Sequence, residues 1–341
     1  MKWFMNNGEN SDVVVSTRVR LARNIDNFPF PQKLDAQNGT LVIESVKNAL
    51  DSEYSERLNY IDLTKKNDTE LSALVEDHLI SNEFCKSTVY PKMLITNEEN
   101  NISIMVNEED HLRIQAIFPG FALNEAYTAA QNVDEAIEKK QTYAFDDTLG
   151  YLTSCPTNLG TGLRASVMVH IPALCKSGYL KSLSSILTKL GLTVRGLYGE
   201  GTEGHGCFFQ ISNQITLGID ENAAIEKLQS AVKQIIAKER EQRKLITEDV
   251  SMQDKLCRSV GILKTARKMS AAEAIQLISD ARLCAHTGLV EGLQAINLLK
   301  LMIDIMPSHI ILQNSLAQNN ALQRDTLRAS IIRKQLEKAV I

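Results

Sequence analysis

The chain has 341 residues, of which 44% are hydrophobic and 5% aromatic, and its formal net charge at pH 7 is -4. This length is enough for two domains, and this composition is that of an ordinary globular protein, which excludes a mainly disordered chain. The negative net charge excludes a protein that binds polyanions through bulk positive charge, so any phosphate site must be a local cluster of cations.

β-Branched and apolar residues with interspersed arginines make up residues 13–21. This pattern predicts a strand that presents Arg18 and Arg20 on one face, because side chains alternate along a strand. Amphipathic helices are expected next, at residues 40–58 and 69–84.

The segment from Met93 to Gly120 predicts two strands joined by a polar turn. The other expected strands are 152–153, 164–172, 192–197 and 207–211, and the other expected helices are 124–142 and 173–190. Strands that arrive in groups, with helices between the groups, favour an antiparallel or mixed sheet covered by helices. The predicted fold class is therefore α+β.

Helical periodicity without strand signals begins after residue 220 and continues to the end of the chain. We place a domain boundary near residue 240, which gives domains of residues 1–240 and 241–341. The second is expected to be a small all-helical domain, interrupted at Pro307.

The cysteines are scattered, without a C-x-x-C pair or the spacing of a zinc site: Cys85, Cys155, Cys175, Cys207, Cys257 and Cys284. This pattern favours a reducing compartment. No apolar run approaches the roughly 18 residues that a transmembrane helix needs, and the N-terminus turns polar within a few residues. We expect a cytoplasmic protein that does not enter a membrane.

Two short motifs concentrate reactive side chains: NEEDHLR at residues 107–113 and CPTNLGTGLRAS at residues 155–166. Together with STRVR at 16–20 and GEGTEG at 199–204, they resemble the signatures of the guanidino (phosphagen) kinases. These enzymes transfer the γ-phosphoryl group of ATP to a guanidinium nitrogen. The resemblance, over roughly residues 11–235, implies an antiparallel glutamine-synthetase-like sheet flanked by helices, and it implies ATP and Mg²⁺ as cofactors.

A guanidinium acceptor stays protonated at any accessible pH, so the enzyme must bind it through carboxylates and help to remove a proton. The resemblance assigns this work to Glu109 and Glu203, and it places Cys155 beside the acceptor as a thiolate. In isolation the same residues would be taken as surface glutamates and a small buried cysteine.

The donor side requires positive charge, because phosphoryl transfer is catalysed mainly by positioning and electrostatic stabilisation. The residues that the resemblance places at the ATP phosphates are Ser16, Arg18, Arg20, Arg113, Arg164 and Ser166. Mg²⁺ is expected to arrive with ATP and to have no direct protein ligand, with Glu108 or Asp110 reaching it at most through water. Arg23 is expected to be a solvated surface arginine.

Three departures locate the chain within this superfamily. Creatine and arginine kinases carry a helical domain before STRVR, whereas here the motif begins at Ser16, so we expect a more open acceptor side. Tyr198 and Met168 replace an arginine and a histidine of those kinases, which implies rearranged phosphate and adenine contacts, with Arg195 as a candidate. The third departure is the C-terminal helical segment, which contains RDTLRA at residues 324–329.

This combination resembles the bacterial protein arginine kinases, whose RDxxRA motif implies a separate, regulatory phosphoarginine pocket. The residues concerned are Arg324, Asp325, Arg328 and Ala329. On a helix, Arg324 and Arg328 are i,i+4 neighbours that can hold a dianion, while Asp325 can hold a guanidinium. The alternative is an Asp325–Arg328 salt bridge on a solvated helix face.

The resemblance implies phosphorylation of arginine side chains in proteins, including the enzyme itself, as part of a stress response. It also implies the CtsR repressor, the McsA activator and the ClpC unfoldase as partners, degradation of marked proteins by a Clp protease, and a homodimer, with no direct nucleic-acid binding. Two alternatives remain: a kinase for free arginine or another small guanidino compound, and a catalytically silent phosphoarginine adaptor.

Overall fold

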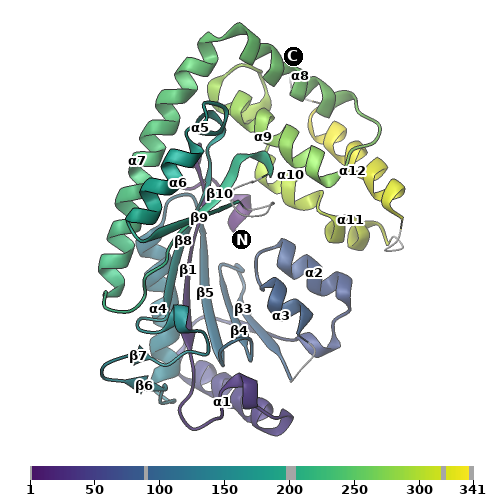
Figure 1. Ribbon diagram of the computed structural model, residues 1–341. Coiled ribbons are helices and arrows are strands. Elements are labelled where there is room, and N and C mark those ends of the chain that lie inside the picture. The colour runs from purple at the N-terminus through teal and green to yellow at the C-terminus, as the bar shows by residue number, and fades with distance from the viewer. Residues whose placement is uncertain (1, 88–90, 197–204, 316–319, 338–341) are drawn as a thin grey trace.

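The computed structural model describes residues 2–87, 91–196, 205–315 and 320–337. Its centre is an antiparallel sheet of eight strands in the order β2-β3-β4-β5-β1-β8-β10-β9 (Figure 1). The strands are β1 (Val14–Arg23), β2 (Leu58–Asp62), β3 (Met93–Asn97), β4 (Ile102–Val106), β5 (Leu112–Pro119), β8 (Leu163–His170), β9 (Leu192–Gly196) and β10 (Phe208–Asn213). A short hairpin, β6 (Phe145–Asp146) and β7 (Gly150–Tyr151), lies apart from the sheet.

The helices are α1 (Ala36–Glu53), α2 (Asp68–Glu76), α3 (Asn82–Lys86), α4 (Leu123–Glu138), α5 (Pro172–Lys176), α6 (Leu180–Lys189), α7 (Glu221–Glu248), α8 (Val250–Thr265), α9 (Ala271–Thr287), α10 (Leu298–Asp304), α11 (Pro307–Asn314) and α12 (Ala321–Gln335). Helices therefore flank an antiparallel sheet and then fill the C-terminal part of the chain. The predicted α+β class is confirmed.

Left-handed residues divide three of the expected elements. The helix expected at 69–84 ends at Glu76 and resumes as α3, because His78 adopts a φ of 63° that an α-helix cannot contain. The helix expected at 173–190 breaks at Gly178, where φ is 77°. The segment from Met93 to Gly120 holds three strands, not two, because Asn107 turns the chain with a φ of 65°.

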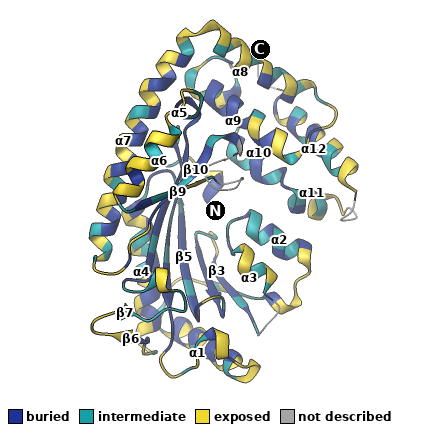
Figure 2. Ribbon diagram, in the orientation of Figure 1, coloured by how far each residue is buried: buried dark blue, intermediate teal, exposed yellow. Residues whose placement is uncertain are grey.

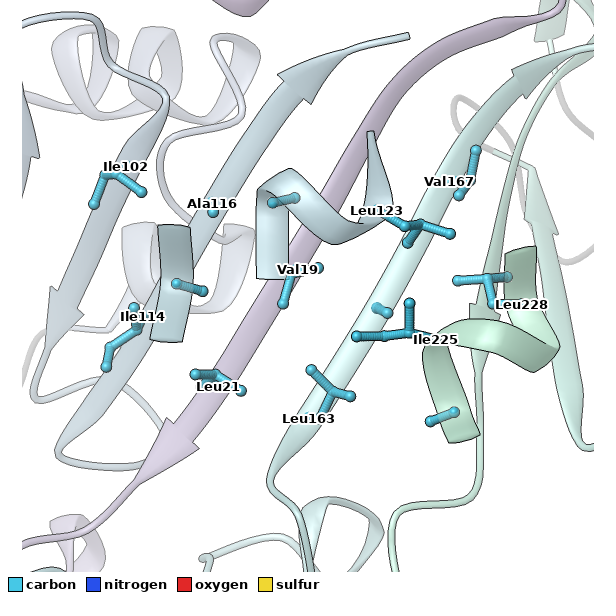
Figure 3. Packing of buried hydrophobic residues seen from close by; sticks show 14 of the residues in the cluster. Val19, Leu21, Ile102, Ile114, Ala116, Leu123, Leu163, Val167, Ile225 and Leu228 are labelled. Atoms are coloured by element: carbon cyan, nitrogen blue, oxygen red, sulfur yellow. The ribbon is translucent and has the colours of Figure 1, made fainter. Parts of the chain in front are cut away.

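Alternation along the central strand β1 gives the sheet two different faces. Val19 and Leu21 point to one face, which α4 and α7 cover (Figure 3). Apolar side chains from strands and helices meet there: Val19, Leu21, Ile114, Ala116, Leu163 and Val167 from the sheet, and Leu123, Ile225 and Leu228 from the helices. Each fully buried valine, leucine or isoleucine among them stabilises the fold by about 1.5–3 kcal/mol. Arg18 and Arg20 point to the opposite face, as predicted.

The expectation that Arg23 is a solvated surface residue is wrong. Arg23 is 3% exposed and forms a buried ion pair with Asp134 of α4 at 2.8 Å. Its guanidinium also lies over the ring of Tyr151, 3.5 Å from the centroid. The reason is that side chains alternate between the two faces along β1. Arg23 is odd-numbered, so it points to the apolar face and lies beneath α4.

The C-terminal helices enclose a second apolar core, which includes Leu256, Ile275 and Ile278. Trp3 and Phe4, from the other end of the chain, pack into this same core. The predicted interruption at Pro307 is confirmed, because Pro307 is the first residue of α11. The boundary near residue 240 stays a prediction, since α7 runs through that position as one unbroken helix.

Buried and exposed residues alternate along α7, which is 28 residues long (Figure 2). Within the described ranges, none of the helices combines the length and the apolar character needed to cross a membrane. All six cysteines are free thiols.

Candidate active site

A cavity of about 1010 Å³ opens on the polar face of the sheet. Its walls are the strands themselves, the α2–α3 segment and Met306, which precedes α11. Charged and polar side chains dominate the lining: Arg18, Arg20, His78, Ser81, Glu108, Glu109, Arg113, Arg164, Arg195 and Gln210.

The antiparallel register brings the predicted arginines together. Arg20 of β1 lies opposite Arg164 of β8, and Arg18 lies opposite Ser166. Arg113 of β5 pairs with β1 two residues beyond Arg20, so its side chain points to the same face of the sheet. Three motifs that are far apart in the sequence thus deliver four guanidinium groups to one cavity.

Among the described residues, this cluster of four arginines has one counter-ion, Glu108. Burial, together with the neighbouring charges of Arg113 and Arg164, lowers the pKa of Arg18 to about 10, and burial and the other three arginines lower the pKa of Arg20 well below its usual value. The Nε atoms of Arg20 and Arg164 are buried without a hydrogen-bond partner. In the described part of the chain only Arg113, of these four, has an ion pair, with Glu108. Such a cluster fits a polyanion like a triphosphate.

Asn107 and His111 hold the NEEDHLR motif in place as a turn between β4 and β5. The Asn107 amide donates a hydrogen bond to the carbonyl of Gly39 in α1 at 3.0 Å. His111 is fully buried: its Nδ1 accepts from the Ile25 N–H at 3.0 Å, and its Nε2 bonds the carbonyl of Pro29 at 2.8 Å. Because burial lowers the pKa of His111, the ring is neutral and serves as an anchor.

Glu108 is bound on both carboxylate oxygens. Its Oε1 accepts from Arg113 at 2.7 Å and from the Ser81 hydroxyl at 2.5 Å, and its Oε2 accepts from the Glu109 N–H at 3.2 Å. Among the described residues no group of three or more His, Cys, Asp or Glu side chains could hold a metal ion. This donor set leaves Glu108 little capacity for a direct metal bond.

Asp110 connects the two motifs. It is 2% exposed, and its Oδ1 accepts from the Ser154 N–H at 2.7 Å and from the Asn24 amide at 2.7 Å. Ser154 precedes Cys155, so Asp110 fixes the start of the second motif. The Cys155 thiol lies 3.0 Å from the hydroxyl of Thr157.

Glu109 lies between these anchored residues and lines the cavity, with Cys155 close enough to lower the pKa of its carboxyl group. Burial and the charges of Asp110 and Glu108 raise the pKa of Glu109, and Arg113 only partly offsets them. The structure therefore brings the predicted carboxylate and the arginine cluster to one cavity, with the predicted thiol of Cys155 near Glu109 and Arg164 but outside the cavity lining.

Two glycines allow the second motif to lie close to the sheet. Gly160 has a φ of 105°, and a Cβ there would come within 2.3 Å of the Thr216 carbonyl oxygen. Gly162 has a φ of 63°, and a Cβ there would come within 2.6 Å of the Ala22 carbonyl oxygen. Only glycine meets both conditions, so the loop can pass from Cys155 into β8 without displacing β1.

Several predicted residues lie elsewhere. Ser16 and Ser166 are each 2% exposed and are absent from the cavity lining, and the Ser166 hydroxyl donates to the Arg18 carbonyl. Met168 packs into the C-terminal core, where a charged histidine would be desolvated. Glu203 and Tyr198 lie outside the described residues, as does the GEGTEG segment.

Sequence reasoning missed some lining residues. Gln210 accepts a hydrogen bond from Arg18 at 2.7 Å. Burial and the charge of Arg18 lower the pKa of His78 to about 4, so His78 lines the cavity as a neutral ring. The only sequence signal was the interrupted apolar pattern near His78 and Ser81, which does not reveal a cavity.

In RDTLRA, Arg328 is 1% exposed and is held on three sides. Its Nε donates to the Ile305 carbonyl at 2.9 Å, and its Nη1 donates to the Met269 carbonyl at 3.0 Å and to Asp325 at 2.6 Å. The Asp325–Arg328 pair therefore exists, but the Arg328 side of it is buried instead of lying on a solvated face. Arg324 is half-buried, and Ala329 belongs to the C-terminal core.

Comparison with known proteins gives matches along most of the chain. Residues 41–242 match the family model described as ATP:guanido phosphotransferase, C-terminal catalytic domain, and residues 249–340 match the one described as Protein-arginine kinase McsB C-terminal domain. The protein-arginine kinase of Syntrophomonas wolfei is 43% identical over 97% of this chain and 94% of its own length. That of Bacillus subtilis is 42% identical over 98% of this chain and 93% of its own length.

Solved structures with a similar fold include a lombricine kinase, with 26% identity, a TM-score of 0.60 and 67% of each chain covered. A duplicated taurocyamine kinase from Schistosoma mansoni, solved with bound components of a transition-state analogue, has 27% identity and a TM-score of 0.59. That match covers 77% of this chain and 38% of the taurocyamine kinase.

Proposed function

The chain belongs to the ATP:guanido phosphotransferase family and, within it, to the protein-arginine kinases, and from this premise we propose which residues carry out its reaction. The enzyme transfers the γ-phosphoryl group of ATP to arginine side chains of proteins and uses ATP with Mg²⁺. The observation that supports the assignment best is the cluster of four arginines beside Glu109, in which only Arg113 has an ion pair among the described residues.

On the donor side, Arg18, Arg20, Arg113 and Arg164 bind the triphosphate. Their charges stabilise the oxygens of the transferred group, and their strand positions fix the γ-phosphorus for in-line attack. Mg²⁺ would enter the site bound to ATP and would neutralise charge on the phosphates; Glu108, whose two oxygens already have protein partners, would contact it only through water.

On the acceptor side, Glu109 accepts hydrogen bonds from the substrate guanidinium and takes a proton from the attacking nitrogen. Its raised pKa suits a proton acceptor better than the usual pKa of a glutamate would. Cys155 orients the guanidinium from the adjacent position, and Glu203 is proposed as the second carboxylate.

A direct test incubates the protein with γ-labelled ATP, a folded protein substrate and free arginine. We expect acid-labile, nitrogen-linked phosphate on the protein, including the enzyme itself. Label on free arginine alone would show a small-molecule kinase instead. ATP binding without any phosphorylation would show a silent adaptor.

The second carboxylate is tested by substituting both glutamates of the GEGTEG segment, Glu200→Gln and Glu203→Gln. We expect E203Q to lower kcat about 10³-fold, because the acceptor then loses one arm of its carboxylate clamp. The measurement is steady-state protein phosphorylation at saturating ATP. If E200Q loses activity while E203Q does not, the role belongs to Glu200.

The RDTLRA helix is proposed as a regulatory phosphoarginine site. Arg324→Ala is expected to abolish activation by added phosphoarginine while kcat without effector changes less than about twofold, because α12 lies outside the cavity lining. Arg328→Ala is the contrasting variant: it removes a buried anchor, so its melting temperature should fall. Equal activation of R324A and the unmodified enzyme would contradict the regulatory role.

The cellular context is also proposed from family membership. It comprises a cytoplasmic homodimer, the CtsR repressor, the McsA activator and the ClpC unfoldase, with degradation of the marked proteins. Co-purification from a cell that expresses these proteins, followed by detection of phosphoarginine on CtsR, tests the set.

A further inference from the structure

Glu108 joins the two halves of the proposed site. One of its oxygens holds Arg113, which faces the donor, and the other holds the backbone N–H of Glu109, which faces the acceptor. The Glu108 side chain is only 4% exposed, so bulk water neither screens its charge nor replaces its partners. The position of this one carboxylate therefore sets the positions of both reacting groups.

Ser81 fixes the direction of Glu108 from a different chain segment. It is the N-cap of α3, where its hydroxyl accepts from the Phe84 N–H at 3.0 Å and donates to Glu108 at 2.5 Å. Burial alone would raise the pKa of Glu108, but the charge of Arg113 and the Ser81 hydrogen bond lower it. Because the Ser81 oxygen is engaged in both directions, its hydroxyl cannot rotate freely.

The C-terminal helices hold the segment that carries Ser81. Glu76, the last residue of α2, accepts hydrogen bonds from the N–H groups of Ser308 at 3.0 Å and His309 at 3.2 Å. These are first-turn donors of α11, which have no partner within their own helix. The His309 Nε2 atom also lies 3.2 Å from a carboxylate oxygen of Asp77. Figure 1 shows α11 lying against α2 at this point.

We infer that Ser81 is a positioning residue for phosphoryl transfer, and that α11 keeps it in place by docking on Glu76. The inference rests on the proposed roles of Arg113 and Glu109. Arg328 of the RDTLRA helix donates to the Ile305 carbonyl, next to the Met306 that lines the cavity and just before α11. Hydrogen bonds from Arg328 to Ile305, from α11 to Glu76 and from Ser81 to Glu108, together with the chain segments between them, thus connect the C-terminal region to Glu108.

The experiment compares S81A, S81T and the unmodified full chain by kcat and by KM for ATP in the protein phosphorylation assay. S81A is expected to lower kcat about tenfold, with a smaller change in KM, because a hydrogen bond to a buried charge is lost. S81T keeps a hydroxyl and a helix cap, so it should restore most of the activity. Melting temperatures show whether each variant is folded.

Docking by α11 is tested with Glu76→Ala and the matched control Glu70→Ala. Both residues belong to α2, but among the described residues the Glu70 carboxylate bonds Lys66 and Asn67, at the start of its own helix. E76A is expected to reproduce about the tenfold loss of S81A, and E70A is not. If E76A does not fold, Glu76→Gln, which keeps one acceptor oxygen, replaces it.

Full activity of S81A, or failure of S81T to restore it, would overturn the positioning role. Equal activity of E76A and E70A would overturn docking. Neither result affects the assignment of the enzyme, which fails only if the unmodified chain does not phosphorylate protein arginines.

Discussion

Replacing Glu109 by glutamine is expected to lower kcat for protein-arginine phosphorylation about 10³-fold, since the variant can neither take a proton nor pair with a guanidinium. The measurement is the initial rate at saturating ATP and protein substrate. Glu226→Gln is the matched control: it removes the same charge from the exposed surface of α7, on the other side of the sheet. An E109Q rate within about tenfold of the unmodified enzyme would contradict the assignment.

The same substitution has a predicted effect on stability and on pH dependence. The pKa of Glu109 in the folded protein lies above its usual value of 4.5, so the ionised form disfavours folding at neutral pH, and this penalty disappears as the pH falls through the raised pKa. E109Q should therefore melt at a higher temperature than the unmodified protein at pH 7, and the difference should shrink in acid. Over the same interval, kcat/KM of the unmodified enzyme should fall as Glu109 becomes protonated.

Replacing Arg20 by glutamine is expected to lower kcat/KM for ATP about 10³-fold, because one of four cations at the phosphates is lost. Arg20→Lys should recover part of this loss by restoring the charge without the planar donor group. The measurement is the rate as a function of Mg²⁺–ATP concentration.

Without ATP, the same substitution of Arg20 should stabilise the protein, although it weakens the use of ATP. Burial and three neighbouring arginines lower the pKa of Arg20, so its charge disfavours folding at neutral pH. R20Q should therefore raise the melting temperature without ATP and reduce the further rise that ATP produces. The control Arg57→Gln removes the same charge from a side chain that is 83% exposed, and it should change neither quantity. An unchanged ATP-induced rise in R20Q would contradict the phosphate role.

The alternation of side chains along β1 explains one correct sequence prediction and one wrong one. Alternation correctly put Arg18 and Arg20 on one face, and the antiparallel register then placed Arg164 opposite Arg20. The same alternation puts Arg23 on the other face, yet a single strand does not show which helix covers that face. Only the packing of α4, with Asp134, reveals that Arg23 is buried.

The helix predictions failed where a left-handed residue was not recognised. His78 ends α2, and the turn that follows brings His78 and Ser81 to the cavity. Non-glycine residues seldom adopt positive φ, so the local sequence favoured one continuous helix. Helical spacing likewise predicted the Asp325–Arg328 pair, but it could not show that Arg328 is buried between two loops.

By itself, the sequence determined the reactive groups of this enzyme: the carboxylates, thiol and arginines of its motifs, the α+β class, and the helical segment that separates protein-arginine kinases from small-molecule guanidino kinases. These properties depend on residue type, order and local periodicity, which a linear sequence contains. The tertiary structure decided which of the three adjacent carboxylates have their own protein partners, because Glu108 and Asp110 are held by residues from distant segments. It also decided that α11 lies against Glu76, since such contacts depend on how separate elements pack.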